Sequence, residues 1–313
     1  MLLTLLLACA PAPTPAALTL REAWRWPFAA NSPWNLPVGE GLLLDDASAP
    51  CSQAVMDPGV DAWVNAETWS HPVVRARDSD PLVGVYREGA LLLELRVPTD
   101  AAPSMPAWPE GDAHLHVVDP EGGAVVELWH ARARPDGGWD VDAIAENDLR
   151  GPGIGEGGVR IYSGSALAGL WRSGESKQGA GHALALSLPL AALSPRVVWP
   201  ATDLDTSRTA DMTGVVPVGQ HVALSAAVDI RAFSTSEGRA LATALRDYGA
   251  YVVDHASGFA LYAEPEAESE VEGMRADIDA IRSALRCSTN STSATPGGPG
   301  ARVAEEAPDF VEE

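Results

Sequence analysis

Acidic and histidine side chains alternate along one predicted strand. Asp112, His114 and His116 are spaced two residues apart, and residues at this spacing point to the same face of a strand. His114 and His116 are therefore placed as zinc ligands are in some enzymes. A third ligand has to come from elsewhere in the chain, and His182 and His130 are the candidates. The alternative interpretation is two strand histidines that face solvent or a polar rim.

A second polar set, Glu127, Trp129 and His130, follows the next turn. If the strand register pairs His116 with Glu127, one face carries a carboxylate, an aromatic ring and two imidazoles. A shift of one residue instead brings His130 and its apolar neighbours to that face, because register decides the whole face of a strand. The five-residue turn before residue 124 leaves both registers open.

The first register suits a polysaccharide cleft. A carboxylate and an imidazole can carry out general acid–base chemistry, and a tryptophan can serve as a platform for a sugar ring. The predicted catalytic residues are Asp112, His114, Glu127 and His182, and the predicted substrate-binding residue is Trp129. Hydrolysis would require a second acid beside Glu127, so the sequence does not distinguish a hydrolase from a lyase.

The elements that must position these residues are mostly strands. Runs of alternating or apolar residues predict strands at 82–86, 91–97, 113–118, 124–131, 139–144, 181–190, 222–230 and 250–254. Turn residues such as those of segment 119–123 separate them. The predicted fold is mainly β, an antiparallel β-sandwich of the jelly-roll type with one or two peripheral helices, and it spans residues 21–287 as a single domain.

Two segments have helical periodicity. The first lies near 236–248, where Ser234 and Glu237 form a capping box. The second lies near 270–286 and begins with Ser269 and Glu272. The Ser-, Thr-, Gly- and Pro-rich composition that follows predicts a loosely ordered acidic tail over residues 288–313.

The first residues predict export. Residues 1–9 form an apolar run that ends at Cys9, as in lipoprotein signals, and the run is too short to span a bilayer. The Pro/Ala-rich residues 10–20 are suited to a tether. We therefore expect an extracytoplasmic protein whose only membrane contact is a lipid on Cys9. Alanine after Cys9 favours the outer membrane or the cell surface.

Cysteine content and charge agree with this location. Cys51 and Cys287 remain after lipidation of Cys9, either as a disulfide in an oxidising compartment or as two buried thiols. The formal net charge of −22, from 43 acidic and 21 basic residues, argues against nucleic acid as a partner. The composition does not specify an oligomeric state.

A set of short motifs resembles a family of secreted bacterial proteins without an assigned reaction. The motifs are Asn31-Ser32-Pro33-Trp34-Asn35, Asp112-Ala113-His114, Glu127-Leu128-Trp129, Gly181-His182-Ala183-Leu184, Pro200-Ala201, Pro217-Val218-Gly219-Gln220 and Tyr248-Gly249-Ala250-Tyr251-Val252-Val253-Asp254. The resemblance covers most of the chain. It implies that residues 21 to about 300, including the segment 285–300, form one unit. It also favours Asp112, His114, Glu127 and His182 over His116 and His130 as functional residues.

Two functions remain open on these grounds. One is a polysaccharide-active enzyme, and the other is a non-catalytic surface module that binds glycan or protein. In the second case the same polar residues would satisfy a buried hydrogen-bond network. A shared cleft that contains His114, Glu127 and His182 would favour the enzyme.

Overall fold

The computed structural model describes residues 21–310 with the exception of 108, 156 and 205. The predicted export signal, Cys9, the tether and the last three residues of the predicted tail lie outside the described residues. Within the described part, no helix has both the length and the hydropathy needed to cross a membrane.

The largest sheet is mixed and has six strands. In spatial order these are β1 (Ala62–Asn65), β15 (Phe259–Tyr262), β10 (Leu184–Leu188), β14 (Ala250–His255), β13 (His221–Leu224) and β16 (Leu285–Cys287). The pairs β1–β15 and β10–β14 are parallel, and the remaining neighbours are antiparallel. A separate parallel pair joins β11 (Leu193–Val197) to β12 (Val216–Val218).

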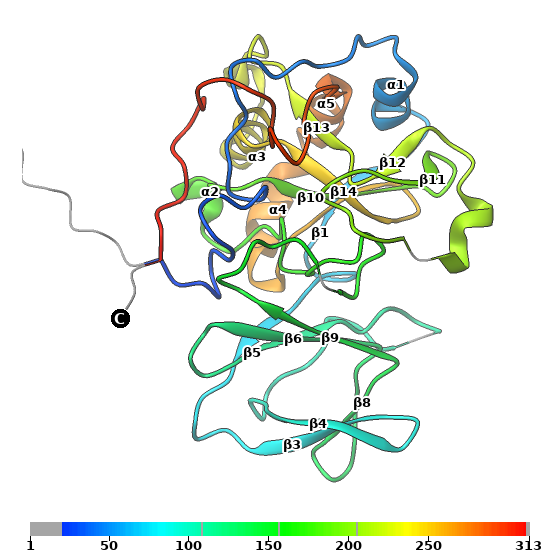
Figure 1. The fold of residues 1–313 in the computed structure, drawn as a ribbon, viewed down its shortest axis with the longest axis vertical. Helices are drawn as coiled ribbons and strands as arrows, with labels where there is room; N and C mark the ends of the chain where they lie inside the picture. Colours follow the sequence, from blue (N-terminus) through cyan, green and yellow to red (C-terminus); the bar gives the residue numbers. More distant parts are fainter. Residues whose placement is uncertain (1–20, 108, 156, 205, 311–313) are drawn as a thin grey trace, which may run out of the picture.

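Two four-stranded sheets form a small sandwich beneath this large sheet (Figure 1). The inner sheet has the order β2 (Val73–Arg75), β5 (Leu115–Val118), β6 (Ala124–Trp129) and β9 (Ala143–Asp148). The outer sheet has the order β4 (Ala90–Arg96), β3 (Leu82–Arg87), β8 (Trp139–Asp140) and β7 (Arg132–Ala133). Leu115, Val117 and Leu128 of the inner sheet pack with Val85 and Trp139 of the outer sheet in one apolar cluster. Leu115 and Val117 are two residues apart, so they point to the same face of β5, toward the outer sheet.

Helices cover one face of the six-stranded sheet. They are α1 (Pro50–Met56), α3 (Ser236–Asp247), α4 (Glu268–Met274) and α5 (Ile278–Ala284), and the short α2 (Glu175–Gln178) lies at one side (Figure 1). Short 3-10 turns occur at Thr206–Asp211, Ile230–Ala232 and Pro265–Ala267. Leu241, Leu245 and Ile281 of the helices join Leu186 and Val252 of the sheet in the largest apolar cluster.

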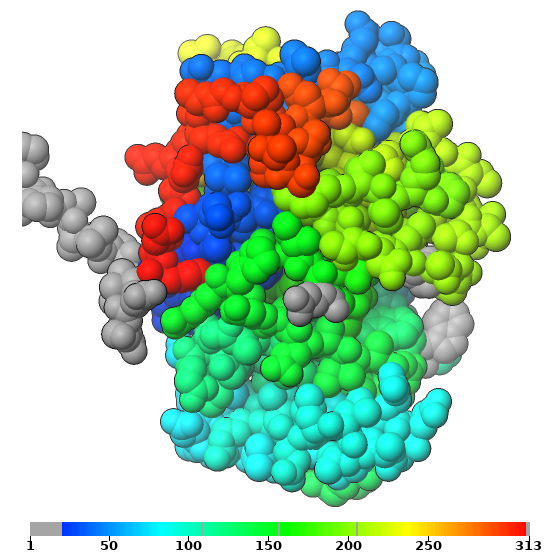
Figure 2. All heavy atoms as spheres, in the orientation of Figure 1, coloured from blue at the N-terminus to red at the C-terminus, as the bar shows by residue number. Residues whose placement is uncertain are grey.

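The opposite face of the six-stranded sheet meets the small sandwich. Val118 and Val125 of the inner sheet, Tyr251 and Val253 of β14, and Leu167 from the loop between them form a second apolar cluster. Figure 2 shows the two parts in close contact. The central strands of the inner sheet are therefore buried on both faces, which explains why every residue of β5 and the middle of β6 are buried.

The fold is mainly β with few helices, as predicted. The antiparallel jelly-roll is not confirmed, because β2 pairs with β5, and β3 with β8, in parallel within the sandwich itself. Parallel pairing requires long crossover connections. Such connections cannot be recognised from the local alternation on which the prediction rested.

The predicted helices differ in detail. Thr235, rather than Ser234, is the N-cap of α3, and its hydroxyl accepts a hydrogen bond from the Gly238 N–H. The second predicted helix is two helices, α4 and α5, separated at residues 275–277. α4 has no side-chain cap at its N-terminus, so the expected Ser269–Glu272 box is not observed there.

The C-terminal segment is held against the N-terminal one, contrary to the loose order predicted for residues 288–310. Backbone hydrogen bonds join Thr289 to Leu43 and Val303 to Val38, and Figure 2 shows the two segments in contact. Cys51 and Cys287 form a disulfide with a Cα–Cα distance of 6.1 Å. Residues 285–300 were expected from the resemblance to belong to the folded unit, and these contacts are consistent with that expectation.

Candidate functional site

Three histidines meet between the sandwich and the six-stranded sheet. His71 lies in the loop before β2, His114 directly precedes β5, and His116 lies within β5. One ring nitrogen from each lies within 4.8 Å of the others. The Nδ1 of His71 is 2.9 Å from the Nε2 of His116. These three side chains could together hold a metal ion, and we call them the three-histidine cluster.

The parallel pairing of β2 with β5 brings His71 to the cluster. Val73 is in register with His116, and the His116 N–H donates to the Pro72 carbonyl at 3.0 Å. His71, rather than the predicted candidates His182 and His130, is therefore the third histidine beside His114 and His116. It stands in an irregular segment more than 40 residues before His114, so local sequence patterns carry no signal for this contact.

The antiparallel pairing of β5 with β6 follows the first of the two predicted registers. His116 lies opposite Glu127. Glu127 has no exposed surface, and its carboxylate accepts hydrogen bonds from the Ser165 hydroxyl, from the Ala166 N–H at 2.9 Å and from the Asn147 amide at 3.3 Å. Burial raises the pKa of Glu127 to about 7, although these hydrogen bonds oppose the shift.

A buried arginine borders the same site. The guanidinium of Arg160 lies 4.4 Å from the ring centroid of Tyr262, and the ring of His71 lies 5.1 Å from the same ring. Arg160 donates to the Ala168 carbonyl at 3.4 Å. Its Nε and Nη2 atoms are buried and have no hydrogen-bond partner among the described residues. Buried polar groups in proteins are normally paired, so Arg160 is poised to bind an anionic group.

The environment keeps the three histidines neutral. Burial lowers the pKa of His114 to about 3, with further lowering from the charges of Arg160 and His130. The pKa values of His71 and His116 are likewise held well below the ordinary value, first by burial. Neutral imidazole is the form that coordinates metals.

An accessible carboxylate and an aromatic ring lie at the edge of the cluster. The Asp112 side chain is 42% exposed, and His130 Nε2 lies 4.0 Å from its carboxylate. Burial raises the pKa of Asp112, opposed by the charges of His130 and His255 and by a hydrogen bond from Trp129. The half-buried ring of Trp129 stacks on His130 at a centroid distance of 3.7 Å. Asp112, Trp129 and His130 form what we call the tryptophan platform.

Strained backbone lies on both sides of the cluster. Trp69, Ala113 and His130 are non-glycine residues with positive φ values of 56°, 43° and 53°. Such conformations cost about 1–3 kcal/mol each and tend to occur at functional sites. Each of them lies within two residues of a histidine of the cluster or belongs to the tryptophan platform.

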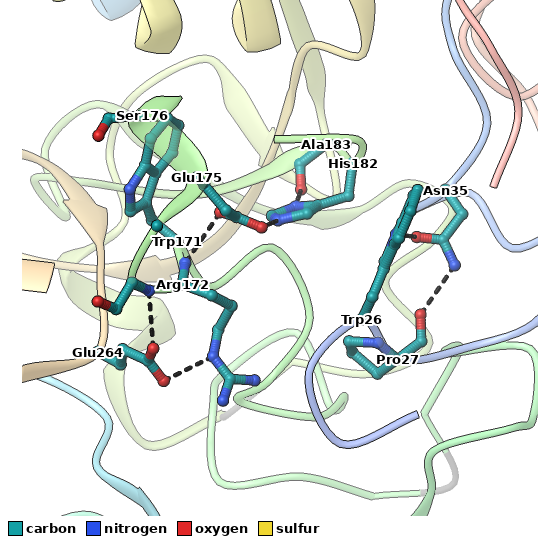
Figure 3. A network of polar contacts seen from close by, with 12 residues as sticks. Trp26, Pro27, Asn35, Trp171, Arg172, Glu175, Ser176, His182, Ala183 and Glu264 are labelled. Carbon is teal, nitrogen blue, oxygen red and sulfur yellow. Dashed lines mark hydrogen bonds and ion pairs between the residues drawn. The ribbon is translucent and has the colours of Figure 1, made fainter. Parts of the chain in front are cut away.

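His182 lies in a different network (Figure 3). Its Nε2 is 2.8 Å from the Glu175 carboxylate, and its Nδ1 is 2.9 Å from the Ala183 carbonyl. Burial lowers the pKa of His182, but the charge and hydrogen bond of Glu175 outweigh burial and the net shift is upward. Next to this network, the Arg172 guanidinium donates to Glu264 at 2.6 Å.

The surroundings of His182 leave no room for a sugar. His182, Trp26 and Asn35 line a hollow of about 10 Å³, which holds about one water molecule. Asn35 also donates to the carbonyls of Pro27 and Phe28 at 2.8 and 3.0 Å. Through Asn35, the Asn31–Asn35 motif thus holds the backbone of the preceding residues Pro27 and Phe28 in place. Neither His114 nor Glu127 lines this hollow, so the predicted shared cleft is not observed among the described residues.

The structure thus brings together Asp112, His114, His116, Glu127 and Trp129, and adds His71, Arg160 and Tyr262 to them. The catalytic roles of Asp112, His114, Glu127 and His182 stay predictions. Comparison with protein families, with characterised proteins and with solved structures finds no match to this chain.

Proposed function

We propose that this chain is a lipid-anchored extracytoplasmic protein of bacterial origin that acts on polysaccharide at the tryptophan platform. The observation that carries this proposal is the position of an accessible carboxylate, Asp112, and an aromatic ring, Trp129, directly beside buried imidazoles. Aromatic side chains offer a large apolar face next to polar partners. A sugar ring stacked on Trp129 would bring its hydroxyl groups to Asp112 and His114.

The roles in this proposal follow from the environment of each group. Asp112 has a raised pKa and partial exposure, so it suits proton transfer to or from a bound sugar. His114 is neutral and buried, so it suits hydrogen bonding to a sugar hydroxyl group rather than proton transfer. Arg160 has unpaired donors and suits a carboxylate or another negative group on the chain, which favours acidic polysaccharides. Glu127 has no exposed surface, and we assign it a positioning role through Ser165 and Ala166.

A second candidate is a glycan-binding module without catalysis. Its support is the carboxylate of Glu127, which is already engaged by Ser165, Ala166 and Asn147. A side chain held in this way links β6 to the loop that contains Ser165 and Ala166. The tryptophan platform would then bind sugar, and no bond would be cleaved.

The test is a screen of the protein without residues 1–17 against neutral and acidic polysaccharides. Reducing-end and unsaturated-product assays would detect hydrolase and lyase activity, and a gel-retardation assay would detect binding alone. We expect Trp129→Ala to weaken binding at least tenfold, and Asp112→Asn to abolish turnover while binding is kept. Binding without product for the wild type would favour the module.

The matched control is Trp63→Ala, because Trp63 is also half-buried but lies in β1, away from the platform. Unchanged binding in Trp129→Ala, or an equal loss in Trp63→Ala, would contradict the assigned surface. An absence of both binding and turnover across the panel would contradict a polysaccharide function.

A further inference from the structure

The three-histidine cluster has the composition of a transition-metal site. Its members come from the loop before β2, the residue before β5 and the centre of β5, and no member is a surface residue. Their ring centroids are 4.4, 5.1 and 5.7 Å apart. Unrelated structural histidines seldom converge from separate segments in this way, because each buried imidazole must lose its hydration.

The distances fit a shared ion. Zinc lies 2.0–2.1 Å from each histidine nitrogen, so two nitrogens of a tetrahedral site are separated by about 3.3 Å. The His71–His116 pair is already at 2.9 Å, and the whole set lies within 4.8 Å. Small rotations of the three rings therefore bring all three nitrogens to one centre.

The hydrogen bonding of the cluster is incomplete without a further partner. The Nδ1 atoms of His114 and His116 are buried and have no partner among the described residues. A buried polar atom without a partner costs about 1–3 kcal/mol. The unpaired Nδ1 of His114 is an independent sign that the site accommodates something besides protein atoms. The Nδ1 of His116 points away from the Nε2 that faces His71 and needs a separate partner.

The charges around the cluster indicate which kind of ligand would complete the coordination of the ion. Three neutral imidazoles leave a zinc ion with its full positive charge and an open fourth position, as in catalytic zinc sites. Arg160 lies at the same place, and its Nε and Nη2 atoms have no hydrogen-bond partner among the described residues. An anion on the fourth position, such as hydroxide or a carboxylate, would halve the charge of the ion and accept hydrogen bonds from Arg160.

We propose that His71, His114 and His116 bind one zinc ion, with its fourth position open to an anionic ligand beside Arg160. Imidazole ligands without thiolates or carboxylates suit zinc and also cobalt. Metal binding at this place does not require that the protein act on polysaccharide. The two proposals can therefore fail separately.

The test measures metal binding by the full chain. The protein is stripped with a chelator and titrated with zinc, and the bound metal is counted by mass spectrometry of the digested protein. Cobalt serves as the optical probe, because tetrahedral cobalt absorbs visible light. We expect one zinc per chain, displacement of cobalt by zinc, and an absorption edge spectrum with three imidazole nitrogens as ligands.

Variants locate the site. His71→Gln and His114→Gln should each weaken zinc binding about 100-fold or more, whereas His221→Gln should leave it unchanged. His221 is a matched control, because it is also a buried histidine but contacts Ser288 and Tyr248 instead. Because His114 is buried, circular dichroism of each variant has to show that it is folded before its affinity for zinc is compared.

Two results would overturn the proposal. One is the absence of stoichiometric zinc binding by the stripped wild-type chain. The other is zinc binding that survives in folded His114→Gln with unchanged affinity. Arg160→Met adds a further readout: it should weaken the binding of an anion such as azide to the cobalt form at least tenfold while the cobalt itself stays bound.

Discussion

Glu127 combines complete burial with three hydrogen-bond donors, and the two effects oppose each other. Removal from water favours the neutral acid, whereas the donors from Ser165, Ala166 and Asn147 favour the carboxylate. The balance is a pKa of about 7. Glu127 therefore changes its charge near neutral pH, at the centre of the junction between the sandwich and the six-stranded sheet.

Replacement of Glu127 by Gln should change how stability depends on pH. A folded-state pKa raised from 4.5 to about 7 means that the folded protein binds more protons than the unfolded chain between these values. Wild-type stability should therefore fall by about 3 kcal/mol, relative to Glu127→Gln, as pH rises through this window. Urea denaturation of both proteins at about pH 4 and about pH 8 measures the difference.

Ser165→Ala is the companion variant. It removes a donor to the carboxylate, so the pKa of Glu127 should rise further and the loss of stability should extend to higher pH. A stability difference between wild type and Glu127→Gln that stays constant over the whole range would contradict the raised pKa.

At the scale of elements, the break between α4 and α5 is tied to the start of α3. Asp277 lies in the break and accepts hydrogen bonds from the backbone and hydroxyl groups of both Ser234 and Thr235. A side chain at Gly238 would place its Cβ 2.1 Å from the Asp277 carboxylate. The glycine in the first turn of α3 is therefore required by this contact.

Asp277→Ala should destabilise the protein by about 3 kcal/mol, because several donors to a charged acceptor are lost together. Burial raises the pKa of Asp277, but the hydrogen bonds from Ser234 and Thr235 outweigh burial and lower it to about 2. The contribution of Asp277 is thus complete above the unfolded pKa of 3.8 and is lost as pH falls toward 2. Thermal unfolding at neutral pH and in acid checks both statements.

The matched control is Glu272→Ala, because Glu272 is an exposed acidic residue on the neighbouring helix α4. It should change the free energy of unfolding by less than about 0.5 kcal/mol. Equal effects of the two substitutions would contradict the role of Asp277 as the link between the helices.

Single elements were largely predictable, because their signals are local. The strands β3, β4, β6 and β14 lie close to the predicted ranges, and α3 lies at the predicted helix. The breakdown of the second helix into α4 and α5 was not predictable. Its cause is a tertiary contact from Asp277 to a segment more than 40 residues earlier, which the helical periodicity does not contain.

At the scale of the whole molecule, the disulfide joins the two ends of the described fold. Cys51 in α1 and Cys287 in β16 are 236 residues apart. In the chain-entropy model, closing a loop of this length stabilises the fold by about 5 kcal/mol. The bridge also fastens the edge strand β16 of the six-stranded sheet to the helix that covers it.

The variant Cys51→Ser/Cys287→Ser should unfold at lower denaturant concentration than the wild type, with a loss of about 5 kcal/mol or less. Reductant should lower wild-type stability to that of the variant and leave the variant unchanged. Calorimetry with and without reductant provides the measurement. If reductant leaves the unfolding temperature of the wild type unchanged, the disulfide does not contribute to stability.

The sequence by itself determined the strands around the site, the cysteines available for pairing and the mainly β class, because alternation and turn residues act over a few positions. Only the tertiary structure decided the register of His116 with Glu127 and the separate network of His182. It also decided the position of His71 in the three-histidine cluster. These features depend on parallel and cross-layer pairing between distant segments. Such pairing is selected by burial of the central strands β5 and β6 between two layers, and no short segment encodes it.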